Sequence, residues 1–207
     1  MDETMDIEER ARAMTPDWAL AELAAGNQRF TEGRPNFGTQ SAHRVELASA
    51  QYPFAVILGC SDSRVPVETV FDRPAGDLFV IRVAGNFIDE YGLASLEYGI
   101  AVLGARLVYV LGHSSCGALT AAVNFLEEGV PAPGTVQRIV DRLTPIARAT
   151  RRDEGWIDAA VRHNVRETVA EILRTSSVVA EAVAQKKLKV VGGTYDLATG
   201  HVERLDA

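Results

Sequence analysis

The sequence predicts an α/β fold: a mainly parallel, roughly four- to five-stranded sheet covered by helices on both faces, with an N-terminal helical arm. Short apolar runs rich in β-branched residues recur along the chain, separated by stretches with apolar residues at helical spacing. The runs are continuously apolar rather than alternating, which is typical of strands buried in a parallel sheet. Strands are therefore expected at residues 54–58, 78–83, 107–111, 188–195 and, along one edge, 201–205.

The helical arm is expected over residues 15–33, ahead of the first strand. Thr15 offers a hydroxyl for the N-cap, Pro16 suits the first turn, and Asp17 lies near the positive end of the helix dipole. The apolar residues of the arm form a stripe that a lone helix cannot bury, so the arm packs on its own sheet or on a second subunit. The polar residues 1–14 before it are expected to be disordered.

The remaining helices are expected between the strands, wherever apolar residues recur at helical spacing. Proline or glycine marks several of their ends. Pro66 suits a helix start, Gly104 suits a stop, and a proline- and glycine-rich stretch at 129–134 interrupts the pattern. A long valine-rich stripe predicts one continuous helix near the C-terminus. The expected helices span residues 43–50, 65–71, 94–103, 117–126, 136–149 and 157–185.

A chain of 207 residues is expected to form a single domain, 1–207, with a substantial core. Its net charge of −7 argues against nucleic acid or an anionic membrane surface as a partner. The acidic N-terminus lacks the apolar region of a signal peptide, and no apolar run approaches the roughly 20 residues that span a bilayer. With only two cysteines, a structural disulfide is not expected, and a cytoplasmic location is predicted.

Metal-capable side chains follow two of the predicted strands. They are Cys60 and Asp62, with Arg64, after strand 54–58, and His113 and Cys116, with Gly117, after strand 107–111. Because the carboxyl ends of parallel strands meet at the edge of the sheet where ligands bind, these side chains should lie close together. A cysteine taken alone is more often a small buried hydrophobic residue. Two cysteines and one histidine, however, are a common ligand set for catalytic zinc, which leaves the fourth position for water.

The pattern Cys-x-Asp-x-Arg at 60–64 and the pattern His-x-x-Cys-Gly at 113–117 together resemble those of the β-class carbonic anhydrases, and the resemblance covers about residues 27–195. It implies reversible hydration of carbon dioxide to bicarbonate and a proton, by attack of zinc-bound hydroxide. One Zn²⁺ per subunit would be held by Cys60, His113 and Cys116. The resemblance also implies a homodimer, in which the N-terminal arm embraces the partner subunit, and often a homotetramer.

The same resemblance implies roles for two charged residues. Asp62 would orient the hydroxide by accepting its hydrogen bond, while Arg64 holds Asp62 away from the metal. In a closed state of some family members, the aspartate is itself the fourth zinc ligand and excludes water. Because protonation would bias this switch, higher activity at alkaline pH is expected.

Five further residues match the substrate pocket of plant-type members of the family. Gln51 would donate its amide to bound carbon dioxide or bicarbonate across the dimer interface, and the Gly117 backbone N–H would help to stabilise the oxyanion. The pocket walls would be formed by Phe79, Ala84 and Tyr98. For each of these wall residues, plain core packing is the alternative.

Two other interpretations stay open. One keeps the fold and the metal but takes carbonyl sulfide or carbon disulfide as the substrate, as certain relatives do. Retention of Gln51 and of the Asp62–Arg64 pair favours carbon dioxide instead. The other is a structural zinc site with no turnover, closed permanently by Asp62, because structural zinc sites usually have four protein ligands.

Overall fold

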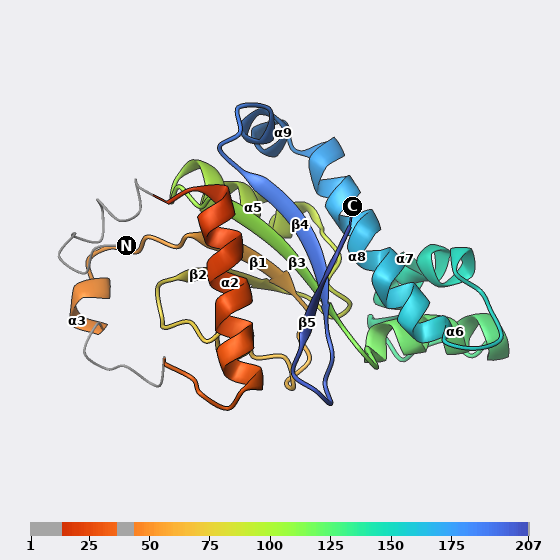
Figure 1. The fold of residues 1–207 in the computed structure, drawn as a ribbon. Coiled ribbons are helices and arrows are strands. Elements are labelled where there is room, and N and C mark those ends of the chain that lie inside the picture. The colour runs from red at the N-terminus through yellow and green to blue at the C-terminus, as the bar shows by residue number, and fades with distance from the viewer. Residues whose placement is uncertain (1–13, 37–43, 207) are drawn as a thin grey trace.

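The structure is a computed structural model that describes residues 14–36 and 44–206. Residues 1–13, which belong to the segment predicted to be disordered, lie outside these ranges. So does the first residue of the helix predicted at 43–50. Within them, the chain forms a five-stranded sheet with helices on both of its faces, as Figure 1 shows. This confirms the predicted α/β fold class.

The sheet has the strand order β2-β1-β3-β4-β5. Its strands are β1 (Ala55–Gly59), β2 (Leu78–Arg82), β3 (Leu107–His113), β4 (Lys189–Tyr195) and β5 (Val202–Leu205). Strands β1 to β4 pair in parallel, and β5 pairs antiparallel with β4 at one edge. Every residue of β1 and β3 is buried, as their unbroken apolar runs predict, whereas the edge strand β2 is only half-buried.

Helices cover both faces of the sheet and one end of it (Figure 1). They are α2 (Pro16–Thr31), α3 (Arg44–Leu47), α4 (Val67–Val70), α5 (Glu90–Ala101), α6 (Gly117–Glu128), α7 (Val136–Ala149), α8 (Trp156–Thr175) and α9 (Ser177–Ala184). On one face, α2 and α4 form a core around Ile57 and Phe71, and on the other α5, α8 and α9 form a core around Leu58 and Ile172. A third core, which includes Cys60, joins α6, α7 and the start of α8. None of the helices in the described ranges is both long and apolar enough to cross a membrane.

The N-terminal helix α2 packs on the sheet of its own chain. Ala19 and Leu23 are buried there, and the Trp18 ring meets the Phe54 ring edge-on, with their centroids 5.3 Å apart. The Thr15 hydroxyl accepts a hydrogen bond from the Trp18 amide, as expected of an N-cap. Its own sheet therefore buries part of the apolar stripe of this helix, and the contact of the arm with a partner subunit stays a prediction.

Helix α5 begins at Glu90, earlier than the predicted start at residue 94. The Asp89 side chain accepts a hydrogen bond from the Gly92 amide at 2.7 Å and so caps the helix. The helix also ends at Ala101, before the predicted end at residue 103. The predicted start followed apolar spacing alone, which carries no information about a polar cap.

The single long helix predicted at 157–185 is wrong, because this segment forms two helices, α8 and α9. Ser176 between them has an extended backbone, with φ −101° and ψ 112°. Its hydroxyl accepts a hydrogen bond from the Val179 amide at 3.1 Å and donates one to the Glu97 carboxylate, so it caps α9 and ties it to α5. Both helices pack on the same face of the sheet, and the apolar stripe therefore continues through the break and conceals it.

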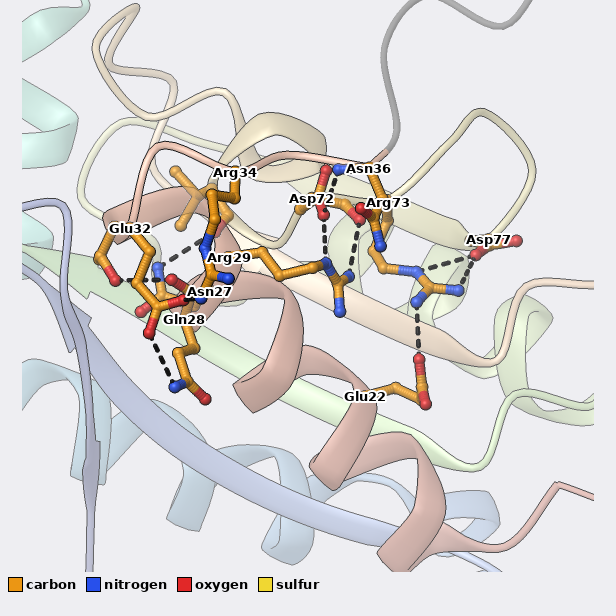
Figure 2. A network of polar contacts seen from close by, with 12 residues as sticks. Glu22, Asn27, Gln28, Arg29, Glu32, Arg34, Asn36, Asp72, Arg73 and Asp77 are labelled. Carbon is orange, nitrogen blue, oxygen red and sulfur yellow. Dashed lines mark hydrogen bonds and ion pairs between the residues drawn. The ribbon is translucent and has the colours of Figure 1, made fainter.

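A network of ion pairs ties α2 to the segment that follows α4 (Figure 2). The Arg29 side chain donates to the Asp72 carboxylate at 2.5 Å, and this fully buried carboxylate also accepts a hydrogen bond from the Asn36 amide at 3.0 Å. Beside it, the Arg73 guanidinium reaches Glu22 on α2 at 2.8 Å. These contacts anchor α2 to the connection between β1 and β2.

We expect Asp72→Asn to lower the free energy of unfolding by about 2 kcal/mol, the usual scale for a hydrogen bond to a charged group. Asparagine tolerates the left-handed backbone of this position (φ 45°), so the variant isolates the lost charge. Glu32→Gln alters the exposed Arg34–Glu32 pair at the end of the same helix and should leave stability nearly unchanged. Urea unfolding of the two variants tests this, and equal losses would contradict it.

Candidate metal centre

The two motifs lie side by side because their strands are neighbours. β1 and β3 are adjacent and parallel, with Gly59 opposite Leu111. Cys60 follows β1 directly and His113 is the last residue of β3, so both emerge at the carboxyl edge of the sheet. The chain continues from β1 to β2 on one side and later returns to β3 on the other, so the strand order reverses here. Such a reversal is where open α/β sheets bind ligands.

Cys116 joins the group from the turn after β3. It is the N-cap of α6, and Ser115 just before it has a left-handed backbone (φ 54°) that turns the chain at the strand ends. The two cysteine sulfurs and a ring nitrogen of His113 all lie within 4.8 Å of one another. All three residues, Cys60, His113 and Cys116, are buried, and both cysteines are free thiols. The structure therefore brings together the three residues predicted as metal ligands.

One ring nitrogen of His113 is free to bind a ligand. The other, Nδ1, lies 2.9 Å from the Ser114 carbonyl oxygen and must donate to it, which leaves the lone pair on Nε2. Nε2 is buried and has no hydrogen-bond partner among the described residues. A buried polar atom of this kind indicates a ligand. Two sulfurs and an imidazole nitrogen are donors that zinc prefers, so the residues present fit a zinc ion.

The two thiols of the group are close enough to affect each other's ionisation. A hydrogen bond from Cys116 lowers the pKa of Cys60 against the effect of burial, with smaller contributions from His113 and the Gly85 amide. The pKa of Cys116 is raised, because it donates that hydrogen bond and is itself buried. Metals bind the thiolate form, so Cys60 is prepared for a metal, whereas Cys116 must lose its proton when one binds.

Asp62 lies beside the group but is held by Arg64. The Arg64 guanidinium donates to both carboxylate oxygens, at 2.9 and 2.7 Å, and the Arg64 amide adds a third hydrogen bond at 2.9 Å. The guanidinium holds the pKa of Asp62 well below its usual range. Asp62 Oδ2 lies 3.9 Å from Nε2 of His113. A carboxylate is therefore close to the ligand group, with both of its oxygens bound to Arg64.

Sequence reasoning missed two groups that support Cys60. The Arg82 guanidinium, at the end of β2, donates to the carbonyl oxygens of Cys60 and Asp62, at 2.9 and 2.6 Å. The Gly85 amide donates to the Cys60 sulfur at 3.3 Å. An arginine within an apolar strand was the available signal for the first of these. For the second, the available signal was the glycine that follows the strand predicted at 78–83.

Two of the predicted pocket residues lie next to the ligand group. Gly117 follows Cys116 as the first residue of α6, and the space that a Cβ would occupy there is open. The N-terminus of a helix presents free N–H groups, which suit a developing negative charge. Ala84 immediately precedes Gly85, whose amide reaches the Cys60 sulfur.

The other three predicted pocket residues lie elsewhere in the chain. Gln51 is exposed and precedes β1, so it lies at the opposite end of that strand from Cys60. Phe79 pairs with Val56 on β1, about 10 Å along the strand from its carboxyl end. Its ring packs against Tyr98, with centroids 6.1 Å apart. A single chain does not bring these three residues to the ligand group.

Comparisons with known proteins agree with this fold. Residues 55–202 match the family model described as carbonic anhydrase. The chain is 44% identical to carbonic anhydrase 2 of Mycobacterium tuberculosis over 187 residues, which cover 89% of this chain and 90% of that protein. It is 42% identical to the carbonic anhydrase of Mycolicibacterium smegmatis, over 91% of this chain and 92% of that protein. A solved tetrameric β-carbonic anhydrase from the filamentous ascomycete Sordaria macrospora superimposes with a TM-score of 0.71 and 26% identity, over 92% of this chain and 96% of that one.

These similarities cover the candidate site as well as the sheet. The matched stretch contains both motifs, at 60–64 and 113–117, and the two mycobacterial relatives align over nearly their whole length. The structural neighbour, which shares the fold, is of the β class. This chain therefore belongs to the β class of the carbonic anhydrase family.

Proposed function

We propose that this protein is a zinc enzyme that reversibly hydrates carbon dioxide to bicarbonate and a proton. The observation that carries the proposal is the buried group of Cys60, His113 and Cys116, which has the donor set of catalytic zinc and lies beside a carboxylate held by arginine. Membership of the carbonic anhydrase family supports the same reaction. A cytoplasmic location is also proposed, because reducing conditions preserve the two free thiols.

Cys60, His113 and Cys116 would hold one Zn²⁺ per subunit. When bound, zinc supplies a Lewis acid whose open fourth position acidifies water to a pKa of about 7. The Ser114 carbonyl fixes the His113 ring through Nδ1, so that Nε2 faces the other ligands in the required tautomer. Arg82 holds the Cys60 backbone by its carbonyl, which keeps this ligand in place.

Asp62 would orient the attacking water by accepting a hydrogen bond from it. A carboxylate has about four lone-pair sites, so acceptor capacity remains beside the bonds to Arg64. Arg64 would have a second effect, because a carboxylate bound at both oxygens competes poorly for a metal. This supports the open arrangement over the closed one, in which Asp62 is the fourth ligand.

Carbon dioxide would need few specific contacts with the protein. Carbon dioxide is apolar and electrophilic at carbon, so it needs a dry pocket next to the nucleophile and a donor for the oxyanion that forms on attack. The Gly117 amide at the start of α6 would be that donor, and Ala84 would line the pocket. Bicarbonate would then leave by exchange with water, and the proton would pass to the buffer.

Gln51, Phe79 and Tyr98 would take part only if a second copy of the chain supplies them, in a homodimer or homotetramer. The edge strand β2 supports such an assembly, since its apolar residues Leu78–Ile81 are only half-buried. Tyr98 is 48% exposed, which is unusual for a large aromatic side chain unless a partner covers it. The Sordaria macrospora structure is tetrameric, which also supports an oligomer.

Stopped-flow hydration of carbon dioxide, by protein of measured zinc content and across pH, tests the proposal. We expect activity to rise between about pH 6.5 and pH 9, because ionisation of the attacking water near pH 7 creates the nucleophile. Asp62 stays ionised over this range, since its pKa is depressed, so its own protonation does not set the profile. A flat profile in a non-coordinating buffer would contradict the mechanism. Turnover of carbonyl sulfide without carbon dioxide would contradict the proposed substrate.

A further inference from the structure

The turn after β2 places a backbone N–H on the sulfur of Cys60. The Gly85 amide donates to Cys60 Sγ at 3.3 Å in a buried environment. Gly85 has a φ of +86°, and a Cβ added there would lie 2.7 Å from a Leu143 methyl carbon and 3.2 Å from Ala118 Cβ. Only glycine fits both this backbone conformation and this space, so the close approach of the amide to the sulfur depends on an unsubstituted residue.

A buried asparagine on α8 holds the same glycine by its other backbone group. Asn164 Nδ2 donates to the Gly85 carbonyl oxygen at 2.8 Å, and the residue is only 2% exposed. On α8 it lies among buried residues such as Ala160, Val161 and Val165. A carboxamide on an apolar helix face costs free energy unless it is hydrogen-bonded, so the bond to Gly85 explains how this asparagine is accommodated there.

We propose that Asn164 is a positioning residue for the metal centre, which holds the Gly85 carbonyl so that the Gly85 N–H stays on the Cys60 sulfur. The inference rests on the metal site of the proposed function, but not on its substrate. A hydrogen bond to a thiolate draws charge away from sulfur, so the ligand donates less of it to the metal and the metal becomes more electrophilic. Groups that support a ligand in this way typically change metal affinity or activity by about 10- to 100-fold.

The rest of the turn has its own supports, so loss of the asparagine should not unfold it. The Val83 amide donates to the Gly59 carbonyl at 3.1 Å, and the Asn86 amide donates to the Val83 carbonyl at 3.0 Å. Arg82 remains bonded to the Cys60 carbonyl. What Asn164 adds is a restraint on Gly85 from the side of α8, across the core that contains the ligands.

The test compares Asn164→Leu, which has nearly the same size but no donor, with Thr168→Val as a matched control. Thr168 is also buried on α8, one turn further along, so its variant removes a polar group from the same helix without touching the turn. Metal-free protein is titrated with Zn²⁺, and the cobalt-substituted protein is examined for its thiolate-to-metal charge-transfer band. We expect Asn164→Leu to weaken zinc binding by about 10-fold or more, because Cys60 loses the hydrogen bond that stabilises and positions its thiolate. The band should move to longer wavelength, because the sulfur becomes more electron-rich.

Thr168→Val should leave zinc affinity and the band unchanged. If Asn164→Leu does the same, the asparagine is merely structural and the proposal is wrong. If the Asn164→Leu protein does not fold, Asn164→Ala takes its place with the same two readouts. Neither readout uses carbon dioxide. A wild-type protein that binds zinc but does not hydrate the gas would thus overturn the proposed function and leave this inference standing.

Discussion

Cys60→Ser is expected to lose bound zinc and carbon dioxide hydration together. Serine at this position cannot supply a thiolate, and its hydroxyl does not ionise near neutral pH, so only His113 and Cys116 would remain as ligands. The loss of zinc affinity should exceed the roughly 100-fold that changes to supporting groups can cause. Metal analysis of the purified variant and stopped-flow hydration measure the two effects.

A control for this variant is Ser63→Ala, which removes an exposed hydroxyl from the same loop. It should retain both zinc and activity. Because Ser63 lies in the same loop, this control distinguishes the loss of a ligand from a general disturbance of the chain between Cys60 and Arg64. Cys60→Ser protein that kept stoichiometric zinc and full activity would rule out the proposed ligand set.

Arg64→Ala should keep zinc but lose most of its activity, by about 100-fold or more. The guanidinium binds both oxygens of Asp62 and the Ser115 carbonyl at 3.5 Å, and among the described residues it makes no hydrogen bond to a ligand side chain, so its loss should leave the metal group intact. Without it, Asp62 is free to turn toward the metal, where it would exclude the attacking water. Zinc content should therefore stay near one per chain while the hydration rate falls.

Arg64→Lys is the matched control, because it keeps the positive charge but cannot bind both carboxylate oxygens in the same planar geometry. We expect its activity to lie between those of the wild type and Arg64→Ala. Full activity in Arg64→Ala would overturn the role assigned to this residue. Asp62→Asn completes the series: if Asp62 were a permanent fourth ligand of a structural site, this variant would lose zinc.

Much of the fold could be predicted, because most elements carry their own signal. The unbroken apolar runs at 54–58 and 107–111 correspond to β1 and β3, since strands buried on both faces must be apolar throughout. Helix α7 has the predicted range of 136–149. Two of the errors occur where one polar side chain sets a boundary, as Asp89 does for α5 and Ser176 does for α9.

The candidate site was also predictable only in part. Its three ligand residues could be predicted, because each closely follows or ends an apolar strand and parallel strands end at one edge. Gln51, Phe79 and Tyr98 could not be tied to the site by one chain, since β1 separates Gln51 from the ligands and the aromatic pair lies along β2 and α5.

The sequence by itself determined which donors the site has, two thiols and an imidazole, and that they follow strands of one kind. Only the tertiary structure decided that their donor atoms lie within 4.8 Å of one another, and that Asp62 is bound by Arg64 rather than free. It also decided that Asn164 meets Gly85, which is 79 positions away along the chain. Periodicity records which face of an element is apolar, whereas contacts of this kind depend on strand register and on how helices pack, which short stretches of sequence do not encode.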